Sequence, residues 1–208
     1  MTLYANPSTR KSTIVRFIDE AFPAEAGELT PEWGRLRNAR RKRRPVIRAL
    51  RPTDVHLVHA MSAELSAHSL AQRFFVGTPA IPRALLRQLA AVDHGQNEAI
   101  IAVVGGRAIG LAQYVRLAYP TRAELAVIVV DAWQRNGIGR MLVTHLAELA
   151  AARGITRFEA SVLPDNEPAR RAVARGWPGA AGTESEDSVD YDLPLSRHCR
   201  PGPLVFGP

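Results

Sequence analysis

The stretch Trp133-Gln134-Arg135-Asn136-Gly137-Ile138-Gly139-Arg140 decides the fold of this 208-residue chain. It follows an apolar run typical of a strand and precedes apolar residues at helical spacing. A strand, a tight glycine turn and a helix in that order present free backbone N–H groups at the start of the helix, where phosphate binds. Gly137 and Gly139 have no Cβ, so a diphosphate can approach the backbone, and Arg135 and Arg140 add positive charge. We therefore predict a site for a ligand that carries a pyrophosphate.

Two common phosphate-binding motifs do not fit this spacing. A dinucleotide-binding motif needs G-x-G-x-x-G early in a βαβ unit, with an acidic residue about 20 positions later. Only two useful glycines are present, and they lie in the second half of the chain. A P-loop needs a lysine after its last glycine, whereas Arg140 follows Gly139.

The rest of the chain alternates between strand and helix patterns. Gly105-Gly106 suits the tight turn of a hairpin, Gly154 suits the end of a helix, and Asp165 or Asn166 is a good N-cap. The predicted order is strand 46–50, helices 54–65, 69–75 and 83–92, hairpin strands 99–104 and 107–117, strand 122–130, helix 141–153, strand 156–163, helix 166–175 and strand 188–195.

The glycine stretch resembles the Q/R-x-x-G-x-G/A signature of the GNAT superfamily of N-acyltransferases, with Gln134, Gly137 and Gly139 in its three defining places. The resemblance implies an α/β fold with a mixed, mostly antiparallel central sheet, flanked by helices and with a splayed central strand pair. It implies that residues 134–140 wrap the pyrophosphate of acetyl-CoA. It also implies that strand 122–130 bulges, and that the backbone of Ile128, Val129 and Val130 pairs with the pantetheine arm. For Asn166 two interpretations are open, a contact to the coenzyme or a plain helix cap.

A second stretch narrows the resemblance. Residues 65–75, LSAHSLAQRFF, look like the L-S-x-x-S-x-x-x-R-F-F stretch of bacterial Pat-type protein lysine acetyltransferases. Val92-Asp93-His94 with Glu98-Ala99 resembles the next block of that group, and the likeness covers residues 46–177. It implies a protein acceptor, typically an acyl-CoA synthetase. Larger Pat proteins carry a further synthetase-like or cyclic-nucleotide domain, for which these 208 residues leave no room, so regulation and acceptor stay open.

Glu124 is the candidate general base. A free lysine has a pKa near ~10.4 and must lose a proton before it attacks a thioester. Glu124 begins an otherwise apolar strand, and alternation places it on one face with Ala126, Ile128 and Val130. Partial burial would raise the pKa of its carboxyl toward that of a useful base, and Pat-type enzymes use a Glu at this place. The alternative is an ion pair with Arg122 or another surface arginine.

No general acid stands out. Many GNAT enzymes use a tyrosine of the last helix to protonate the leaving thiolate, but Val173 stands near that place here. Ser161, or a serine within 66–69, could assist, or the thiolate could leave unaided. His68, His94 and His145 are isolated, so we expect no metal site. The single cysteine, Cys199, excludes a disulfide framework.

The positive charge belongs to the N-terminal part. Residues 1–51 hold 12 Lys or Arg and 5 Asp or Glu, which accounts for the whole net charge of +7, and the remaining residues hold 15 of each. We expect a basic, flexible extension over 1–44, an acetyltransferase domain over 45–195 and a tail over 196–208. The extension could touch nucleic acid or an acidic protein, but its basic run over 35–44 has no interleaved aromatic residues to stack on bases, apart from nearby Trp33, which favours a solvated linker.

The predicted function is transfer of an acetyl group from acetyl-CoA to a protein lysine. Acetylation of a small amine, or acyl-CoA sensing without catalysis, are the alternatives. The chain has no apolar run that could span a membrane and no signal-peptide pattern after Met1, so we expect the cytoplasm. Arginine replaces lysine almost throughout, a composition common in GC-rich bacteria.

Overall fold

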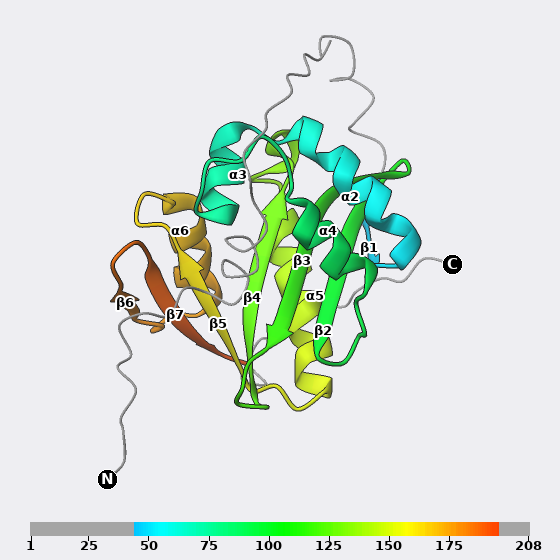
Figure 1. Cartoon of the computed structure of the whole chain (residues 1–208). Helices are drawn as coiled ribbons and strands as arrows, with labels where there is room; N and C mark the ends of the chain where they lie inside the picture. The colour runs from blue at the N-terminus through cyan, green and yellow to red at the C-terminus, as the bar shows by residue number, and fades with distance from the viewer. Residues whose placement is uncertain (1–43, 196–208) are drawn as a thin grey trace.

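A computed structural model describes residues 44–195 (Figure 1). The predicted extension (Arg44 apart) and tail, with Cys199, lie outside this range. Seven strands form one open sheet in the order β1-β2-β3-β4-β5-β7-β6. The strands are β1 (Val46–Ala49), β2 (Asn97–Val104), β3 (Arg107–Arg116), β4 (Arg122–Val129), β5 (Arg157–Val162), β6 (Gly182–Glu184) and β7 (Val189–Pro194).

Five α-helices lie in the described range, and they cover both faces of the sheet. α2, α3 and α4 pack on the face turned to the viewer in Figure 1, and α5 packs on the opposite face. None of the described helices has the length and apolar character needed to cross a bilayer. The helices are α2 (Val55–Met61), α3 (Ala67–Phe74), α4 (Arg83–Ala90), α5 (Ile138–Ala152) and α6 (Glu167–Gly176), with short 3-10 turns at Pro52–Asp54, Ser62–Glu64 and Asp131–Trp133.

The sheet is mixed, and β4 and β5 separate after a short contact. All the strand pairs of the described chain are antiparallel except β4 with β5. That parallel pairing runs only from Arg122↔Arg157 to Glu124↔Glu159. Beyond Glu124 the two strands diverge, which confirms the predicted splayed pair. The edge of β4 that faces β5 is therefore without a strand partner over 125–129.

The bulge expected in β4 is absent. β4 pairs with β3 without a register shift from Gly110↔Val129 to Arg116↔Ala123. The shift lies instead between β2 and β3, at Ala102/Val103. A regular β4 keeps strict alternation: Ala123 faces the α5 side, whereas Ile128 and Val130 join the core under α2, α3 and α4.

Each face of the sheet carries its own hydrophobic core. α5 buries Ile138, Leu142 and Leu146 against the sheet. Its approach to β3 is close, because a Cβ on Gly110 would lie only 2.9 Å from Leu142 Cδ1. Glycine at this position thus lets the start of α5, and the loop before it, sit tightly on the sheet.

Most predicted elements are present, with two differences. The single helix predicted over 54–65 is divided into α2 and a 3-10 turn at Ser62–Glu64, and Leu65 beyond them has extended backbone angles. β6 was not predicted, and it is a three-residue exposed edge strand paired with β7.

Candidate active site

The loop between β4 and α5 has the geometry of an anion site. Gly137 has φ +81° and is the N-cap of α5. The first helical bond recorded runs from Met141 N–H to the Gly137 carbonyl, at 3.0 Å, so the N–H groups of residues 138–140 precede it and belong to the free helix start. A Cβ added to Gly137 would meet no atom within 4 Å. Arg135, Asn136 and Arg140 are exposed around this open space.

The signature glutamine, Gln134, fixes the loop. Its amide nitrogen lies 3.1 Å from the Val129 carbonyl, 3.0 Å from Ser69 Oγ and 3.2 Å from Asp131 Oδ1. Asp131 in turn accepts hydrogen bonds from Ser69 Oγ at 2.6 Å and from the Ser66 N–H at 3.1 Å. The side chain of Gln134 therefore joins the end of β4 to the start of α3.

Helix α3 bridges the ends of the two separated strands. Ser66 caps it by accepting a hydrogen bond from Ser69 N–H at 3.1 Å. Near its other end, Gln72 Nε2 donates to Asp165 Oδ1 at 3.1 Å, and Asp165 belongs to the loop after β5. Figure 1 shows α3 beside the tops of β4 and β5. The Pat-like stretch 65–75 thus forms a cover over the opening in the sheet.

Glu124 lies at the base of this opening. It is the last residue of β4 that pairs with β5, and only 7 % of its surface is exposed. Its partner in charge is Arg73 of α3, whose side chain is buried and whose Cζ lies 4.9 Å from the centroid of the Phe74 ring. Burial lowers the pKa of Arg73 to about 10, and the negative charge of Glu124 opposes that shift. At neutral pH the guanidinium is still protonated, so the structure places a buried cation beside the candidate base.

Arg122, named in the alternative ion pair, has other partners. It donates to Glu159 at 2.8 Å and to Asp192 at 3.4 Å, on β5 and β7. Arg157 also pairs with Asp192, at 2.8 Å. These contacts tie the outer strands together and raise the pKa of Arg122.

Asn166, for which a coenzyme contact or a helix cap was expected, and most of the residues expected near the leaving thiolate have structural roles in this structure. Asn166 caps α6, and its Oδ1 accepts a hydrogen bond from Ala169 N–H at 3.1 Å. Val173 is buried in the α5-side core. The hydroxyls of Ser66 and Ser69 are engaged in the α3 network. Ser161, half-buried on β5, remains on the far side of the opening.

The second Pat-like block is a structural clamp. Glu98 is buried, and its carboxylate lies 2.6 Å from His94 Nδ1 and 2.8 Å from Arg153 Nη2. Arg153 follows α5, so the contact anchors the end of that helix to β2. His145 lies 3.8 Å from Glu148. The described residues contain no cluster of His, Cys, Asp and Glu that could hold a metal.

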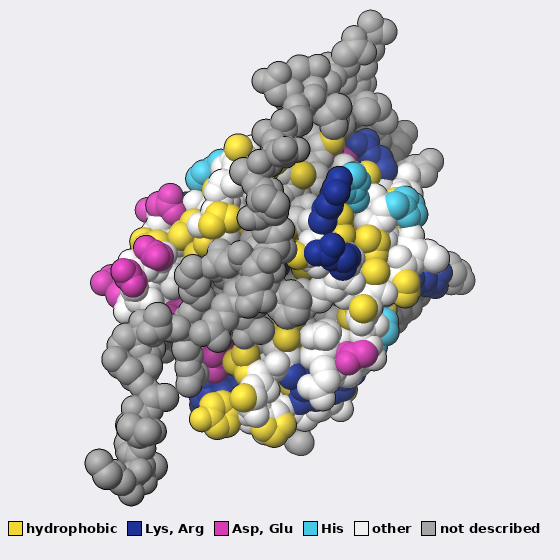
Figure 2. Space-filling model, in the orientation of Figure 1, with side chains coloured by type: hydrophobic (Ala, Val, Ile, Leu, Met, Phe, Trp, Pro, Cys, Tyr) yellow, Lys and Arg dark blue, Asp and Glu magenta, His cyan; other side chains and the backbone are white. Residues whose placement is uncertain are grey.

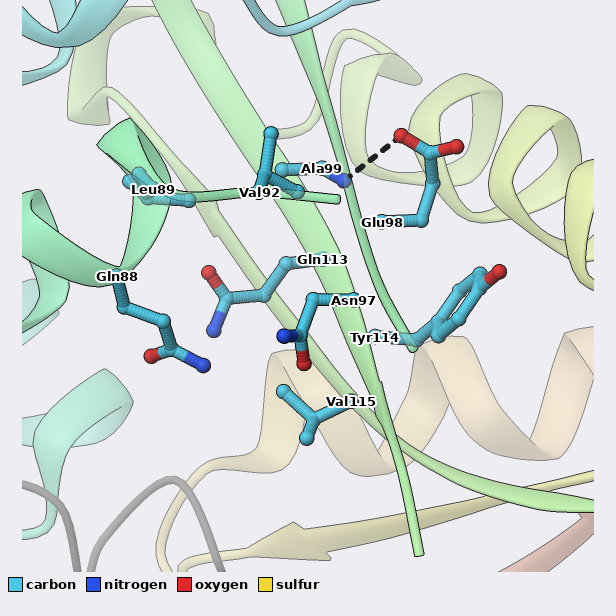
Figure 3. A pocket seen from close by; sticks show the side chains of 9 residues that line it. All are labelled: Gln88, Leu89, Val92, Asn97, Glu98, Ala99, Gln113, Tyr114 and Val115. Atoms are coloured by element: carbon cyan, nitrogen blue, oxygen red, sulfur yellow. Dashed lines mark hydrogen bonds between the residues drawn. The ribbon is translucent and has the colours of Figure 1, made fainter. Parts of the chain in front are cut away.

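A small pocket next to Glu124 was not predicted from the sequence. It lies between α4 and the sheet, has room for about one water molecule, and its lining includes Gln88, Asn97 and Gln113 (Figure 3). Gln113 is 3 % exposed, and both its amide nitrogen and its amide oxygen lack a hydrogen-bond partner among the described residues. A glutamine in the middle of an apolar strand gives no sequence signal for such a site, since the register of the sheet creates it.

Comparison with known proteins follows this geometry. The profile of the acetyltransferase (GNAT) family matches residues 65–177. Acetyltransferase Pat of Mycolicibacterium smegmatis is 35% identical over 150 residues, which cover 70% of this chain and 41% of that protein. This chain therefore spans about two fifths of that relative's length. Acetyltransferase PA5475 of Pseudomonas aeruginosa is 27% identical over 158 residues, 74% of this chain and 85% of that protein.

Among solved structures, the GNAT domain of S. lividans PAT superposes with a TM-score of 0.67 at 24% identity, and the match covers 73% of this chain and 96% of that domain. At this identity the likeness shows the fold. The overall fold of this chain thus has a solved counterpart.

Proposed function

This chain belongs to the acetyltransferase (GNAT) family and is an N-acetyltransferase, and from that premise we propose that it transfers the acetyl group of acetyl-CoA to a protein lysine, with Glu124 as the general base. The observation that carries the proposal is the position of Glu124. It is a buried carboxylate at the point where β4 and β5 part, next to the cation of Arg73.

The open edge of β4 suits the coenzyme. Beyond Glu124 the backbone groups on the β5 side of β4 have no strand partner, so the amides of pantetheine can pair there as an added strand would. In this proposal the pairing uses the backbone of Ile128 and Val129. Val130 was also expected to pair, but its N–H donates to the Ile109 carbonyl and its carbonyl accepts from the Trp133 N–H, so both its groups are occupied. The N–H groups of residues 138–140, with Arg135 and Arg140 nearby, hold the pyrophosphate. Asn166 is also proposed to contact the coenzyme. Its Oδ1 accepts the capping hydrogen bond from the Ala169 N–H, so the rest of its side-chain amide would make this contact.

The chemistry follows from a desolvated but ionised carboxylate. The lysine ammonium gives one proton to Glu124, its nitrogen attacks the thioester carbonyl, and the nitrogen releases its second proton to solvent as the amide forms. A C–N bond forms, the C–S bond breaks, and coenzyme A leaves as a thiolate that takes a proton from solvent. The role proposed for Arg73 is to favour the ionised state of Glu124, since an opposite charge nearby stabilises a carboxylate.

A protein acceptor is favoured by α3. The Pat relative shares 35% identity, and the stretch that carries the Pat-like pattern forms the cover over the active-site opening. The viewed face also presents separated charges: acidic side chains gather over α6, β6 and β7, and basic side chains lie over the region of α4 (Figure 2). Arg83 and Arg87 of α4 are both exposed. Such charge separation orients a macromolecular partner more effectively than a small amine.

The test is an acceptor comparison with the full chain. Release of free thiol from acetyl-CoA is measured with an acyl-CoA synthetase, with polyamines and with an aminoglycoside, and intact-mass spectrometry locates the acetyl group. The proposal expects a gain of one acetyl group on a synthetase lysine. Rapid transfer to a small amine without protein modification would overturn it in favour of a small-amine acetyltransferase. Binding of acetyl-CoA without transfer to any acceptor would favour a sensor.

A further inference from the structure

The outer surface of α4 carries positive charge without a counter-charge. Arg83 and Arg87 stand four residues apart on this helix, so their side chains are neighbours, and both are exposed. Neither has an acidic partner within salt-bridge distance among the described residues. The two guanidinium groups are therefore available to carboxylates of another molecule.

No carboxylate of the neighbouring elements offsets this charge by pairing with it. α2 packs against α4, and neither helix contains an aspartate or a glutamate. Asp54 before α2 pairs with Arg48, and Glu64 after α2 pairs with Arg107. Asp93 follows α4, and its carboxylate accepts two backbone hydrogen bonds within its own loop. We call the outer side of these two helices the α2–α4 surface, and Figure 2 shows basic and histidine side chains gathered over this region.

The positive charge continues into the sequence that precedes α2. The run 35–44 holds seven Lys or Arg and no acidic residue, although only its last residue, Arg44, lies within the described range. Arg44 and Arg51 are both exposed, on either side of β1. Arg51 directly precedes the short turn that leads into α2. The α2–α4 surface is thus continuous along the chain with its most basic segment.

The α2–α4 surface lies on the same side of the sheet as the active-site opening. Leu89 of α4 lies beside Val115 of β3, and Val115 is the cross-strand partner of Glu124. Neighbouring strands are about 5 Å apart and a helix with its side chains is about 10–12 Å across, so the outer side of α4 is on the order of 15 Å from Glu124. A polypeptide whose lysine meets Glu124 therefore has other residues within reach of Arg83 and Arg87.

The rest of this face favours a protein over other polyanions. Acidic side chains gather over α6, β6 and β7 (Figure 2), so a nucleic acid or an anionic membrane laid across the face would meet like charge. α2 and α4 also have no aromatic residue on which a base could stack. A folded protein, in contrast, can present carboxylates to the α2–α4 surface and cations to the acidic side.

From this arrangement we infer that the α2–α4 surface, centred on Arg83 and Arg87, docks an acidic patch of the acceptor protein. The inference rests on the proposed function and adds to it: clients are selected by carboxylates at a set distance from the target lysine, as well as by the lysine itself. Because the contact is electrostatic and exposed, it is expected to weaken as salt screens it.

The test compares two peptide acceptors. Each has one central lysine and, on both sides, a four-residue spacer of glycine and serine that reaches up to about 14 Å. Beyond each spacer one peptide carries four aspartates, and the other carries four serines. The ratio of their kcat/KM values, acidic over serine peptide, is determined for the unaltered full chain, for Arg87→Glu and for Arg175→Glu. Arg175 is the matched control, since it too is an exposed basic residue in the last turn of its helix.

The unaltered chain should prefer the acidic peptide at 0.02 M salt in the assay buffer, a concentration at which the Debye length exceeds about 10 Å. Arg87→Glu should lower the ratio by about fivefold, the scale of one exposed charge contact. Arg175→Glu changes the net charge equally and should leave the ratio within about twofold, the lower end of that scale. The preference should fade as the salt concentration rises. Melting curves check that each variant is folded.

Fluorescence anisotropy with labelled copies of the two peptides measures binding without catalysis. The acidic peptide should bind more tightly to the unaltered chain, and Arg83→Glu combined with Arg87→Glu should remove that preference. Equal kcat/KM values for the two peptides, or an equal loss in Arg87→Glu and Arg175→Glu, would overturn the inference. Tighter binding of a DNA duplex through the same two arginines would overturn it in favour of nucleic acid. Selective peptide binding without acetyl transfer would reject the proposed function and retain the docking surface.

Discussion

Arg73 of α3 and Glu124 of β4 form a charged pair in the interior, at the base of the opening between β4 and β5. The guanidinium has lost its water, which lowers its pKa to about 10, and the charge of Glu124 acts in the opposite direction. The Nη2 atom of Arg73 has no hydrogen-bond partner among the described residues. A buried cation of this kind is destabilising unless a nearby carboxylate is ionised, so each charge depends on the other.

The first prediction concerns Glu124 itself. Glu124→Gln preserves the shape of the side chain but cannot accept a proton, so we expect kcat to fall by about 10²–10⁴-fold, the usual scale for a lost general base. Glu159→Gln is the control, because Glu159 lies opposite Glu124 in the sheet and contacts Arg122 instead. Steady-state kinetics at pH 7.5 measure both. A similar loss in the two variants would show that charge in this region, rather than proton transfer, is what matters.

A second prediction concerns the pH profile. Removing the cation with Arg73→Met makes the ionised carboxylate less favourable, so the acidic limb of kcat/KM should move to higher pH. Arg73→Lys keeps a positive charge and should shift the limb less. Profiles between pH 5 and 9 compare the two, with a melting curve for each variant as a check of folding. Identical profiles in both variants and the unaltered chain would remove Arg73 from the chemistry.

A third prediction separates the two signature glycines. Gly137 has φ +81°, so a Cβ there is strained by about 1–2 kcal/mol, and Gly137→Ala should lower stability and weaken acetyl-CoA binding. Gly139 has ordinary backbone angles, and its added Cβ would meet Val129 Cγ2 at an unstrained 3.8 Å. Gly139→Ala should therefore fold and bind almost normally. The rise in Tm on adding acetyl-CoA measures both effects. Equal behaviour of the two variants would contradict the assigned geometry.

The glycine loop was predictable because its geometry is local. A strand, two glycines and a helix within a short segment can be predicted without knowledge of distant residues. The assignment of β4 as a strand is local as well, because it rests on a continuous run of apolar side chains that lie on both faces of the sheet. The burial of Gln113 and the pairing of Arg73 with Glu124 depend on the register of β3 with β4 and on the docking of α3. Arg73 and Glu124 are 51 positions apart in the chain, and the neighbours of Gln113 come from other strands and from α4, so the local periodicity of the sequence does not predict these contacts.

The errors have local causes as well. The bulge in β4 came from the resemblance, and no residue of that strand demanded it. The three-residue strand β6 has no apolar pattern, because all of its residues are exposed. Gly182 alone does not predict strand β6. In the structure a Cβ at Gly182 would lie 2.4 Å from Val189 Cγ1 on β7, which explains why glycine occupies this position.

A fourth prediction tests the link between α3 and the coenzyme loop. Asp131 accepts hydrogen bonds from Ser66 and Ser69 on α3 and lies 3.2 Å from the Gln134 amide. Asp131→Ala leaves these donors without their acceptor, so we expect acetyl-CoA to bind about tenfold more weakly, since the loop is no longer held in place. Isothermal titration calorimetry measures the Kd. Asp187→Ala, at an exposed position in the turn before β7, is the control. Unchanged affinity in Asp131→Ala would mean that the loop keeps its shape without α3.

The last prediction concerns acid stability. The guanidinium of Arg48 on β1 donates two hydrogen bonds to Asp54, and this contact, with the Arg51 N–H, lowers the pKa of Asp54 from 3.8 to about 2. Because the folded-state pKa lies below the unfolded-state pKa, the unfolded chain binds the proton more tightly. The resulting stabilisation is complete above about pH 5, and it is lost as the pH falls through 4 toward 2. Its size is at most about 2 kcal/mol, since Arg48 is partly exposed to solvent.

Urea unfolding between pH 5.5 and 2.5 checks this dependence. The difference in unfolding free energy between the unaltered chain and Asp54→Asn should be largest at pH 5.5 and should shrink toward pH 2.5, because protonated Asp54 resembles asparagine. Glu167→Gln is the control, since the exposed Glu167–Arg171 pair should contribute well under 1 kcal/mol at any pH. A difference for Asp54→Asn that does not change with pH would assign the contribution to hydrogen-bond geometry, and the charge of Asp54 would then have no part in joining β1 to the helices that follow it.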